Sequence, residues 1–320
     1  MKSIKKIALL FFLVSSFLIS AQDKKAENFS FVAFGDMPYS LPKDYSRFEN
    51  VIKTINEQKS VFTINVGDIK ASATPCSEES YSKILNYYQQ FEKPMIYVPG
   101  DNEWTDCSKK EAGSYDPEER LGVIRKMFYK DKNSFGKEKI ALTSQSQNTD
   151  FSKFVENNRW EYGNISFATI HIVGSNNNFL PTSKNGNKEF YDREKADLAW
   201  IDELFKSAKE KNSSAIVMVI HADMFLGSKD QGEASGFNEV KKKMKELVAD
   251  FKKPVLLING DSHVFLIDKP LYEDSKTKKT VDNFTRLQVH GDANMHAVKI
   301  NVNTSSPSLF QFEEILVPGN

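Results

Sequence analysis

The sequence predicts an α/β fold, and two observations support this prediction. Up to residue 260, short apolar runs alternate with longer stretches that have the periodicity of amphipathic helices. Beyond residue 260, apolar runs follow one another without helices between them. Parallel strands are therefore expected in the first part of the chain, and more antiparallel pairing in the second.

The expected elements follow in order, and each apolar run of four to eight residues is assigned to a strand. The first part contains strands at 29–35, 61–67 and 94–100, helices at 43–58, 77–92 and 117–130, and an Asn-, Ser- and Lys-rich surface excursion at 131–158. The second part contains a hairpin at 159–174, helices at 190–211 and 236–251, and strands at 214–221, 254–260, 263–268, 284–291, 297–303 and 310–317.

Residues 1–21 have the features of a secretory signal peptide. Three lysines precede an apolar run of about a dozen residues, and small residues follow up to Ala21. A membrane anchor is the alternative, but the run is shorter than the ~20 residues that span a bilayer. We therefore expect cleavage after Ala21 and export to the periplasm or the medium. The mature protein is expected to be one domain over 22–320, with no transmembrane segment.

Charge and cysteine content restrict the class of protein further. The 43 basic and 43 acidic residues balance, and loss of the three signal-peptide lysines lowers the net charge by three. No basic surface for nucleic acid is expected from this composition. The chain has two cysteines, Cys76 and Cys107. In an exported protein one disulfide is favoured, with free thiols or a pair of metal ligands as alternatives.

Polar side chains follow five of the predicted strands directly. One Gly-Asp pair is a common turn, but the carboxyl ends of strands in an open α/β sheet meet at one edge, where sites form. Carboxylates gathered there repel one another, and a bound cation offsets the repulsion. The pattern therefore predicts a metal site. Its residues are Asp36, Asp68, Asp101, His221, Asp261 and His263.

The order of these motifs resembles the calcineurin-like metallophosphoesterase superfamily. The matching segments are FGDMPY, VGDIKA, PGDNEW, VIHAD and NGDSHVF, within residues 35–265. The resemblance implies a four-layer αββα sandwich of mixed sheets with a two-metal site between them, and the antiparallel C-terminal strands suit the second sheet. It also implies a hydrolase of phosphate mono- or diesters, in which a hydroxide that bridges the metals attacks phosphorus. A weakly active or inactive metal-binding or scaffold module on the same fold is the alternative, and a site with one metal is another.

The resemblance also assigns the ligands. Asp36, Asp68 and His263 would hold one metal, and Asp68 would bridge to a second. The second metal would be held by Asp68, Asp101, His221 and Asp261. Asp68, His221 and Asn102 receive the direct roles in catalysis. Phosphate esters are the expected substrates, and the oligomeric state is left open.

The sequence departs from the family pattern at four positions. Pro38 and Asn102 stand where the family has histidines, the second of which donates a proton. Asp101 replaces an asparagine ligand and Asp261 replaces a histidine ligand. Because aspartate oxygens are harder ligands, we expect Mn²⁺, Mg²⁺ or Ca²⁺ in preference to Zn²⁺, with iron as a further candidate.

A last set of residues is expected to support the ligands or contact substrate, with packing or surface roles as alternatives. Its members are Tyr39, Glu103, His171, Asn176, His290 and His296. His290 or His296 is considered as the replacement proton donor, because Asn102 cannot protonate a leaving group. In the family fold, Cys76 and Cys107 belong to loops that follow Asp68 and Asp101. A disulfide would therefore join two metal-bearing loops.

Overall fold

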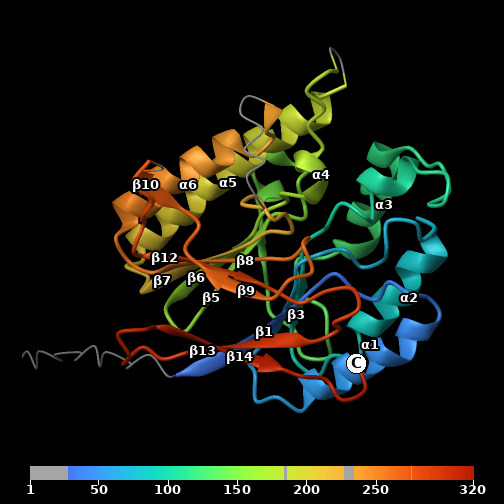
Figure 1. Ribbon diagram of the computed structural model, residues 1–320, viewed down its shortest axis with the longest axis horizontal. Helices are drawn as coiled ribbons and strands as arrows, with labels where there is room; N and C mark the ends of the chain where they lie inside the picture. The colour runs from blue at the N-terminus through green and yellow to red at the C-terminus, as the bar shows by residue number, and fades with distance from the viewer. Residues whose placement is uncertain (1–27, 184–185, 227–233, 275) are drawn as a thin grey trace, which may run out of the picture.

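Two sheets face each other between outer layers of helices in the computed structural model (Figure 1), which describes residues 28–183, 186–226, 234–274 and 276–320. The expected α/β sandwich is confirmed. The predicted signal peptide at 1–21 lies outside the described residues, and the boundaries of a single domain over 22–320 stay a prediction. No helix among the described residues has the length and apolarity that crossing a membrane requires.

The first sheet has five strands in the order β14-β13-β1-β2-β3. Its strands are β1 (Phe29–Phe34), β2 (Thr63–Asn65), β3 (Met95–Tyr97), β13 (Ala297–Val302) and β14 (Phe310–Ile315). Strands β1, β2 and β3 run parallel to one another, and β13 pairs antiparallel with both β1 and β14. The helices of this half are α1 (Lys43–Asn56), α2 (Glu78–Tyr88) and α3 (Pro117–Phe128), and the 3₁₀ turn η1 (Thr105–Ser108) lies between β3 and α3.

The second sheet has seven strands in the order β4-β5-β6-β7-β8-β12-β9. Its strands are β4 (Thr143–Ser144), β5 (Asn158–Tyr162), β6 (Ile165–Thr169), β7 (Ala215–Val219), β8 (Val255–Asn259), β9 (Leu266–Asp268) and β12 (Phe284–Gln288). Helices α5 (Lys188–Glu210) and α6 (Asn238–Phe251) cover its outer face (Figure 1). The smaller elements are the 3₁₀ turns η2 (Gln145–Gln147) and η3 (Thr149–Phe151), the short turn α4 (Gly174–Asn177), and the paired strands β10 (Tyr272–Asp274) and β11 (Lys279–Thr280).

The C-terminal strands correct one expectation. Only β9 and β12 join the second sheet, and β12 pairs parallel with β8. The last two strands, β13 and β14, cross to the first sheet. Val298, Ile300 and Val302 of β13 thereby enter the apolar layer between the sheets. This crossing also pairs the backbone of β1 on its open side, where its polar groups would otherwise lack partners.

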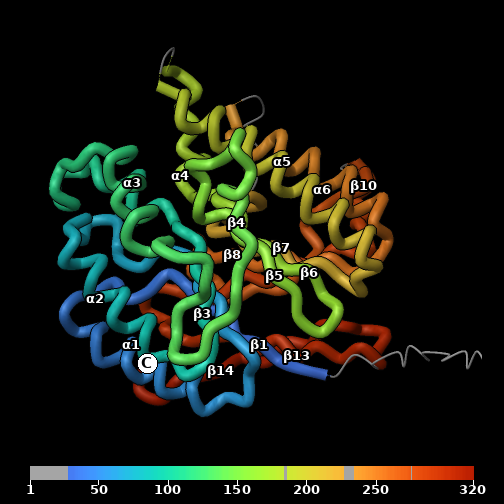
Figure 2. Tube along the Cα trace, turned by 180° about the vertical axis from the view of Figure 1, so that it is seen from behind, coloured from blue at the N-terminus to red at the C-terminus, as the bar shows by residue number. Residues whose placement is uncertain are grey.

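The segment 131–158 is also more than a surface excursion. Phe135 bridges to Met95 at the edge of the first sheet, while β4 pairs with β5 at the edge of the second. Figure 2 shows this segment, in green, running along the side of both sheets. It closes one side of the sandwich.

Alternation along β1 shows how the layers are built. Phe31 and Ala33 face the second sheet, whereas Val32 and Phe34 face α1 and α2. All four side chains are fully buried, as expected for a strand covered on both faces. The strands are therefore packed on both faces, and this packing fixes the positions at which the loops after their carboxyl ends begin.

A disulfide joins Cys76 to Cys107 across a sequence separation of 31 residues. Both residues are fully buried against the first sheet and its helices. The disulfide favoured by the sequence is confirmed. It connects the loop after β2, which carries Asp68, to the η1 turn, which directly follows the turn that carries Asp101.

Replacing both cysteines with Ala should lower the free energy of unfolding by about 3–4 kcal/mol, because the cross-link restricts the unfolded chain over about 30 residues. Denaturant unfolding of the wild type and the double variant under oxidising conditions measures this difference. The same measurement with reductant should bring the wild type to the stability of the variant. Equal stabilities under oxidising conditions would contradict the expectation.

Candidate metal centre

The predicted ligands follow the carboxyl ends of five strands. Asp36, Asp68, Asp101 and His221 come after β1, β2, β3 and β7, and Asp261 with His263 after β8. Asp36, Asp68, Asp261 and His263 have φ values of 56°, 53°, 75° and 59°. Such left-handed conformations are unfavourable for residues other than Gly, and they persist where the surroundings enforce them. The backbone at these four residues is therefore held in an unfavourable conformation, and this conformation directs their side chains into the site.

Five of the six predicted ligands form two overlapping clusters. Asp36, Asp68 and His221 offer ligand atoms within 4.8 Å of one another, and so do Asp101, His221 and Asp261. His221 Nε2 lies 2.9 Å from Asp101 Oδ1, 3.3 Å from Asp68 Oδ1 and 3.9 Å from Asp261 Oδ1. The imidazole therefore stands where the two clusters meet, although the sequence assigned it to one metal alone.

The other ring nitrogen fixes how His221 faces the carboxylates. His221 Nδ1 lies 2.9 Å from the carbonyl oxygen of Val66, which can only accept a hydrogen bond. Nδ1 therefore carries a hydrogen, and neutral His221 presents the lone pair of Nε2 to the cluster. Gly67 makes this approach feasible. A Cβ at Gly67 would lie 3.0 Å from His221 Nδ1 and 2.5 Å from the nitrogen of Gly100.

The buried carboxylates outnumber the one imidazole that can offset their charge within the two clusters. Asp36 Oδ1 accepts a hydrogen bond from the amide of Asp261 at 2.9 Å, but Oδ2 has no partner among the described residues. Burial raises the pKa of Asp36 to about 8 and raises the pKa of Asp68 well above its usual value, although His221 opposes both shifts. A divalent cation would favour the charged forms of both. The donor set of carboxylate oxygens and imidazole nitrogen therefore fits metal ions.

His263 and Tyr39 border the first cluster. His263 Nε2 lies 3.5 Å from Asp36 Oδ1, and the Tyr39 ring meets the imidazole edge-on. The Tyr39 hydroxyl donates to Asp68 Oδ2 at 2.7 Å and accepts from Asn102 Nδ2 at 3.0 Å. The backbone N–H of Asn102 donates to Asp68 Oδ1 at 3.0 Å. Tyr39 and Asn102 thus lie directly against the carboxylate of Asp68.

Glu103 lies beneath the cluster instead of in it. Its Oε1 accepts hydrogen bonds from the Tyr97 hydroxyl at 2.7 Å and from the Gly100 amide at 2.6 Å. The side chain is fully buried. These contacts fix the turn that presents Asp101 and Asn102.

The turn at α4 contributes a residue that the sequence did not single out. Ser175 Oγ donates to Asp101 Oδ2 at 2.7 Å. Buried Arg193 holds the turn by donating to the carbonyl oxygens of His171 and Asn177. The side chain of Asn176 is bonded to the main chain of residues 234 and 236, away from the carboxylates. The sequence feature that could have indicated this turn is its run of three consecutive asparagines, because asparagine tolerates left-handed conformations.

The remaining histidines lie apart from the clusters. His171 Nδ1 is 2.9 Å from Glu156 Oε1; both residues are fully buried, and Glu156 also pairs with half-buried Arg125. His290 Nε2 is 2.9 Å from Glu314 Oε2 and its ring stacks on Phe265. His296 Nδ1 accepts from the backbone N–H of Val317. Among the described contacts, none of these three imidazoles reaches a predicted metal ligand.

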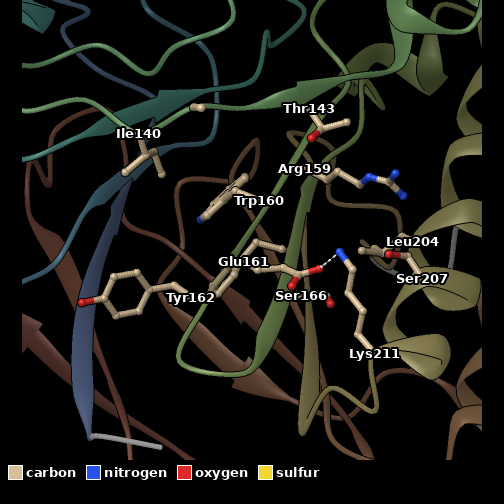
Figure 3. Close-up of a pocket in the computed structure, with 12 residues that line it drawn as sticks. Ile140, Thr143, Arg159, Trp160, Glu161, Tyr162, Ser166, Leu204, Ser207 and Lys211 are labelled. Atoms are coloured by element: carbon tan, nitrogen blue, oxygen red, sulfur yellow. Dashed lines mark hydrogen bonds and ion pairs between the residues drawn. The ribbon is translucent and has the colours of Figure 1, made fainter.

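A separate cavity of about 300 Å³ lies between β5, β6 and the C-terminal half of α5. Figure 3 shows Arg159, Trp160 and Glu161 around it, and the ion pair between Glu161 and Lys211 is part of its lining. None of the predicted site residues lines this cavity. The chemistry of the carboxylate clusters is therefore independent of it.

The motifs and the fold agree with a comparison against protein-family models. The model of the calcineurin-like phosphoesterase family matches residues 29–265. The chain belongs to this family. It is accordingly a hydrolase that acts on phosphate esters, and the resemblance inferred from the sequence is confirmed. No curated protein sequence gives a match.

Solved structures resemble this chain at low sequence identity. Purple acid phosphatase PPD1 from seeds of yellow lupin (Lupinus luteus) is 13% identical with a TM-score of 0.50, over 91% of this chain and 54% of that chain. GAP50, described as the anchor in the inner membrane complex of Plasmodium, is 11% identical with a TM-score of 0.49, over 92% and 90% of the chains. TT1561 of Thermus thermophilus is 11% identical with a TM-score of 0.47, over 91% and 100%.

The buried Glu156 network yields a pH-dependent prediction. Burial opposes the charge of Glu156, but Arg125 and His171 outweigh burial and hold its pKa well below its usual range. Its ionisation therefore stabilises the fold above the ordinary pKa of 4.5, and this stabilisation is lost as the pH falls below that value.

We expect Glu156→Gln to lower the free energy of unfolding by about 3–5 kcal/mol near neutral pH, because Arg125 loses its buried partner. The difference from the wild type should narrow as the pH drops from about 5 to about 3. Urea unfolding of both proteins across this range measures it. A difference that stays constant with pH would show that ionised Glu156 has no such role.

Proposed function

We propose that this chain is an exported, metal-dependent phosphoesterase that hydrolyses phosphate mono- or diesters at the two clusters. The observation that carries the proposal is the convergence of Asp36, Asp68, Asp101, His221 and Asp261 from five strand ends on overlapping ligand sets. His263 stands beside the first set. Family membership supports phosphate esters as the substrate class.

Two divalent ions are the proposed cofactors. Asp36, Asp68 and His263 would hold one ion, and Asp68, Asp101, His221 and Asp261 the other. When bound, such ions polarise the phosphoryl oxygen and lower the pKa of water. Because most of the donors are carboxylates, Mn²⁺, Mg²⁺ or Ca²⁺ should bind in preference to Zn²⁺, with iron as a further candidate.

Besides the metal ligands, Asn102, held by Tyr39, supplies a polar group that could contact the substrate. One hydrogen of the Asn102 amide is directed at the Tyr39 hydroxyl, so the other is available to a phosphoryl oxygen. Asn102 has no proton to give to a leaving group. Esters whose leaving group is stable as an anion should therefore react best.

The proposal of export is supported by the segment at 1–21, in which three lysines precede an apolar run, and by the disulfide between Cys76 and Cys107. Disulfides persist in oxidising compartments such as the bacterial periplasm and the extracellular medium. The disulfide also secures the two loops that carry Asp68 and Asp101. Both features suit a protein that works outside the cytosol.

The proposal is tested with the mature protein stripped of metal. Chromogenic phosphomonoester and phosphodiester substrates are offered, and Mn²⁺, Mg²⁺, Ca²⁺ and Zn²⁺ are restored one at a time. Turnover should return with the hard cations and should fall by at least about 10²-fold in Asp68→Ala, because the bridging carboxylate is lost.

Asp202→Ala is the matched control, because Asp202 lies on α5 and pairs with surface residue Lys243. It should retain full turnover. Tight metal binding without turnover in any condition would refute the phosphoesterase and favour the metal-binding or scaffold module, since Asn102 leaves the site without the family's proton donor.

A second prediction concerns the missing proton donor. Asn102→His should raise the rate for a phenyl ester, which has a poor leaving group, by about tenfold or more relative to a nitrophenyl ester. Asn102→Ala, which removes the amide without adding an acid, should lower both rates. The ratio of kcat/KM for the two esters measures the effect. An unchanged ratio in Asn102→His would show that the departing oxygen is not near residue 102.

A further inference from the structure

A buried arginine in the second sheet connects the sheet to the metal-bearing loops. Arg286 lies on β12 opposite Asp268 on β9. Its Nε and Nη2 donate to the two carboxylate oxygens of Asp268 at 2.8 and 2.7 Å, and its Nη1 donates to Asp223 Oδ1 at 2.5 Å. Only 5% of the Arg286 side chain and 3% of the Asp223 side chain are exposed, so this ion pair is shielded from water.

Asp223 in turn joins the loop after β7 to the loop after β8. It follows His221 by two residues. Its backbone N–H donates to Asp261 Oδ2 at 3.0 Å, and its Oδ2 accepts from Ser262 Oγ at 2.8 Å. The bond to Oδ2 turns the other oxygen of Asp261, Oδ1, toward His221 Nε2. Asp223 thus sets the position of Asp261 relative to His221.

We propose that Arg286 is a positioning residue for the metal centre and acts through Asp223. The inference rests on the proposed function only in that the clusters bind metal. Without the guanidinium, Asp223 would be a buried carboxylate with no cation, and such a group reorients or draws in water. Each response displaces the amide that orients Asp261.

The geometry calls for arginine at this position. A planar guanidinium engages the two oxygens of Asp268 and reaches Asp223 with a third nitrogen, whereas a lysine ammonium is a point charge that cannot keep both contacts in this arrangement. Lysine would still supply a positive charge near Asp223. Arg286→Lys should therefore restore part of what Arg286→Met loses.

The two carboxylate partners allow the effects on the sheet and on the metal centre to be separated. Asp268 pairs with Arg286 across β9 and β12 and makes no contact with a predicted ligand among the described residues. Asp223 alone reaches Asp261 and Ser262. Asp223→Asn should therefore impair metal binding more than Asp268→Asn, although both variants weaken an ion pair of Arg286.

The test is calorimetric titration of Mn²⁺ into the metal-stripped mature protein. Arg286→Met should weaken Mn²⁺ binding at one of the two proposed sites, the one that includes Asp261, by about 10–100-fold, the usual effect of losing a partner that orients a ligand. Arg286→Lys should recover part of this loss. Arg159→Met is the matched control, because Arg159 also lies on a strand, pairs with Glu203 and packs on Trp200, but lines the separate cavity (Figure 3). It should bind Mn²⁺ as the wild type does.

An Arg286→Met protein that is folded by circular dichroism and binds Mn²⁺ within about twofold of the wild type would overturn the inference. If Arg286→Met does not fold, Asp223→Asn decides by the same readout. Two Mn²⁺ sites in the wild type with no ester hydrolysis would refute the proposed function and leave the positioning role to be judged by these affinities. A wild type that binds no Mn²⁺ would refute the positioning role as well.

Discussion

The repulsion among aspartates gathered at one sheet edge is the constraint on which the rest of this structure depends. Asp36, Asp68 and Asp101 are all buried, and Asp261 is close beside them. Without a cation, the only buried positive charge available within the two clusters is a proton on His221, whose pKa the surrounding carboxylates raise well above its usual value despite burial. The fold therefore has to hold a charge arrangement that would separate if the loops were free.

The rigidity that opposes this repulsion comes from several independent supports. The aromatic and aliphatic layer between the sheets fixes the strand ends. Glu103 secures the turn after β3 from below, Arg193 secures the α4 turn, and the disulfide joins the segments after β2 and β3. Arg286 provides the corresponding support on the side of Asp261. The loops after β2, β3, β7 and β8 are thus each held by at least one buried polar or covalent contact besides their strands.

Much of this site could be predicted from sequence because its signals are local. A Gly-Asp pair after an apolar run marks a strand end, and the order of the motifs identified the family. The features that the sequence did not predict depend on contacts between segments that are far apart in the chain. Nothing local places β13 beside β1, because that position is decided by which open edge the last strands can complete. Ser175 and Arg286 reach the site through the α4 turn and through Asp223, which only the folded chain brings near the ligands.

The two departures from the family pattern at Pro38 and Asn102 have one structural consequence in common. Tyr39, next to Pro38, places its hydroxyl between Asp68 and Asn102, 3.3 Å from His263 Nε2. The phenol hydroxyl there bonds to the Asp68 carboxylate and to the Asn102 amide at the same time. Asp68, Tyr39 and Asn102 therefore form one hydrogen-bonded chain. Under the proposed function, the Asn102 amide held by Tyr39 suits stabilisation of charge on phosphoryl oxygens better than transfer of a proton, because an amide has no acidic hydrogen to give.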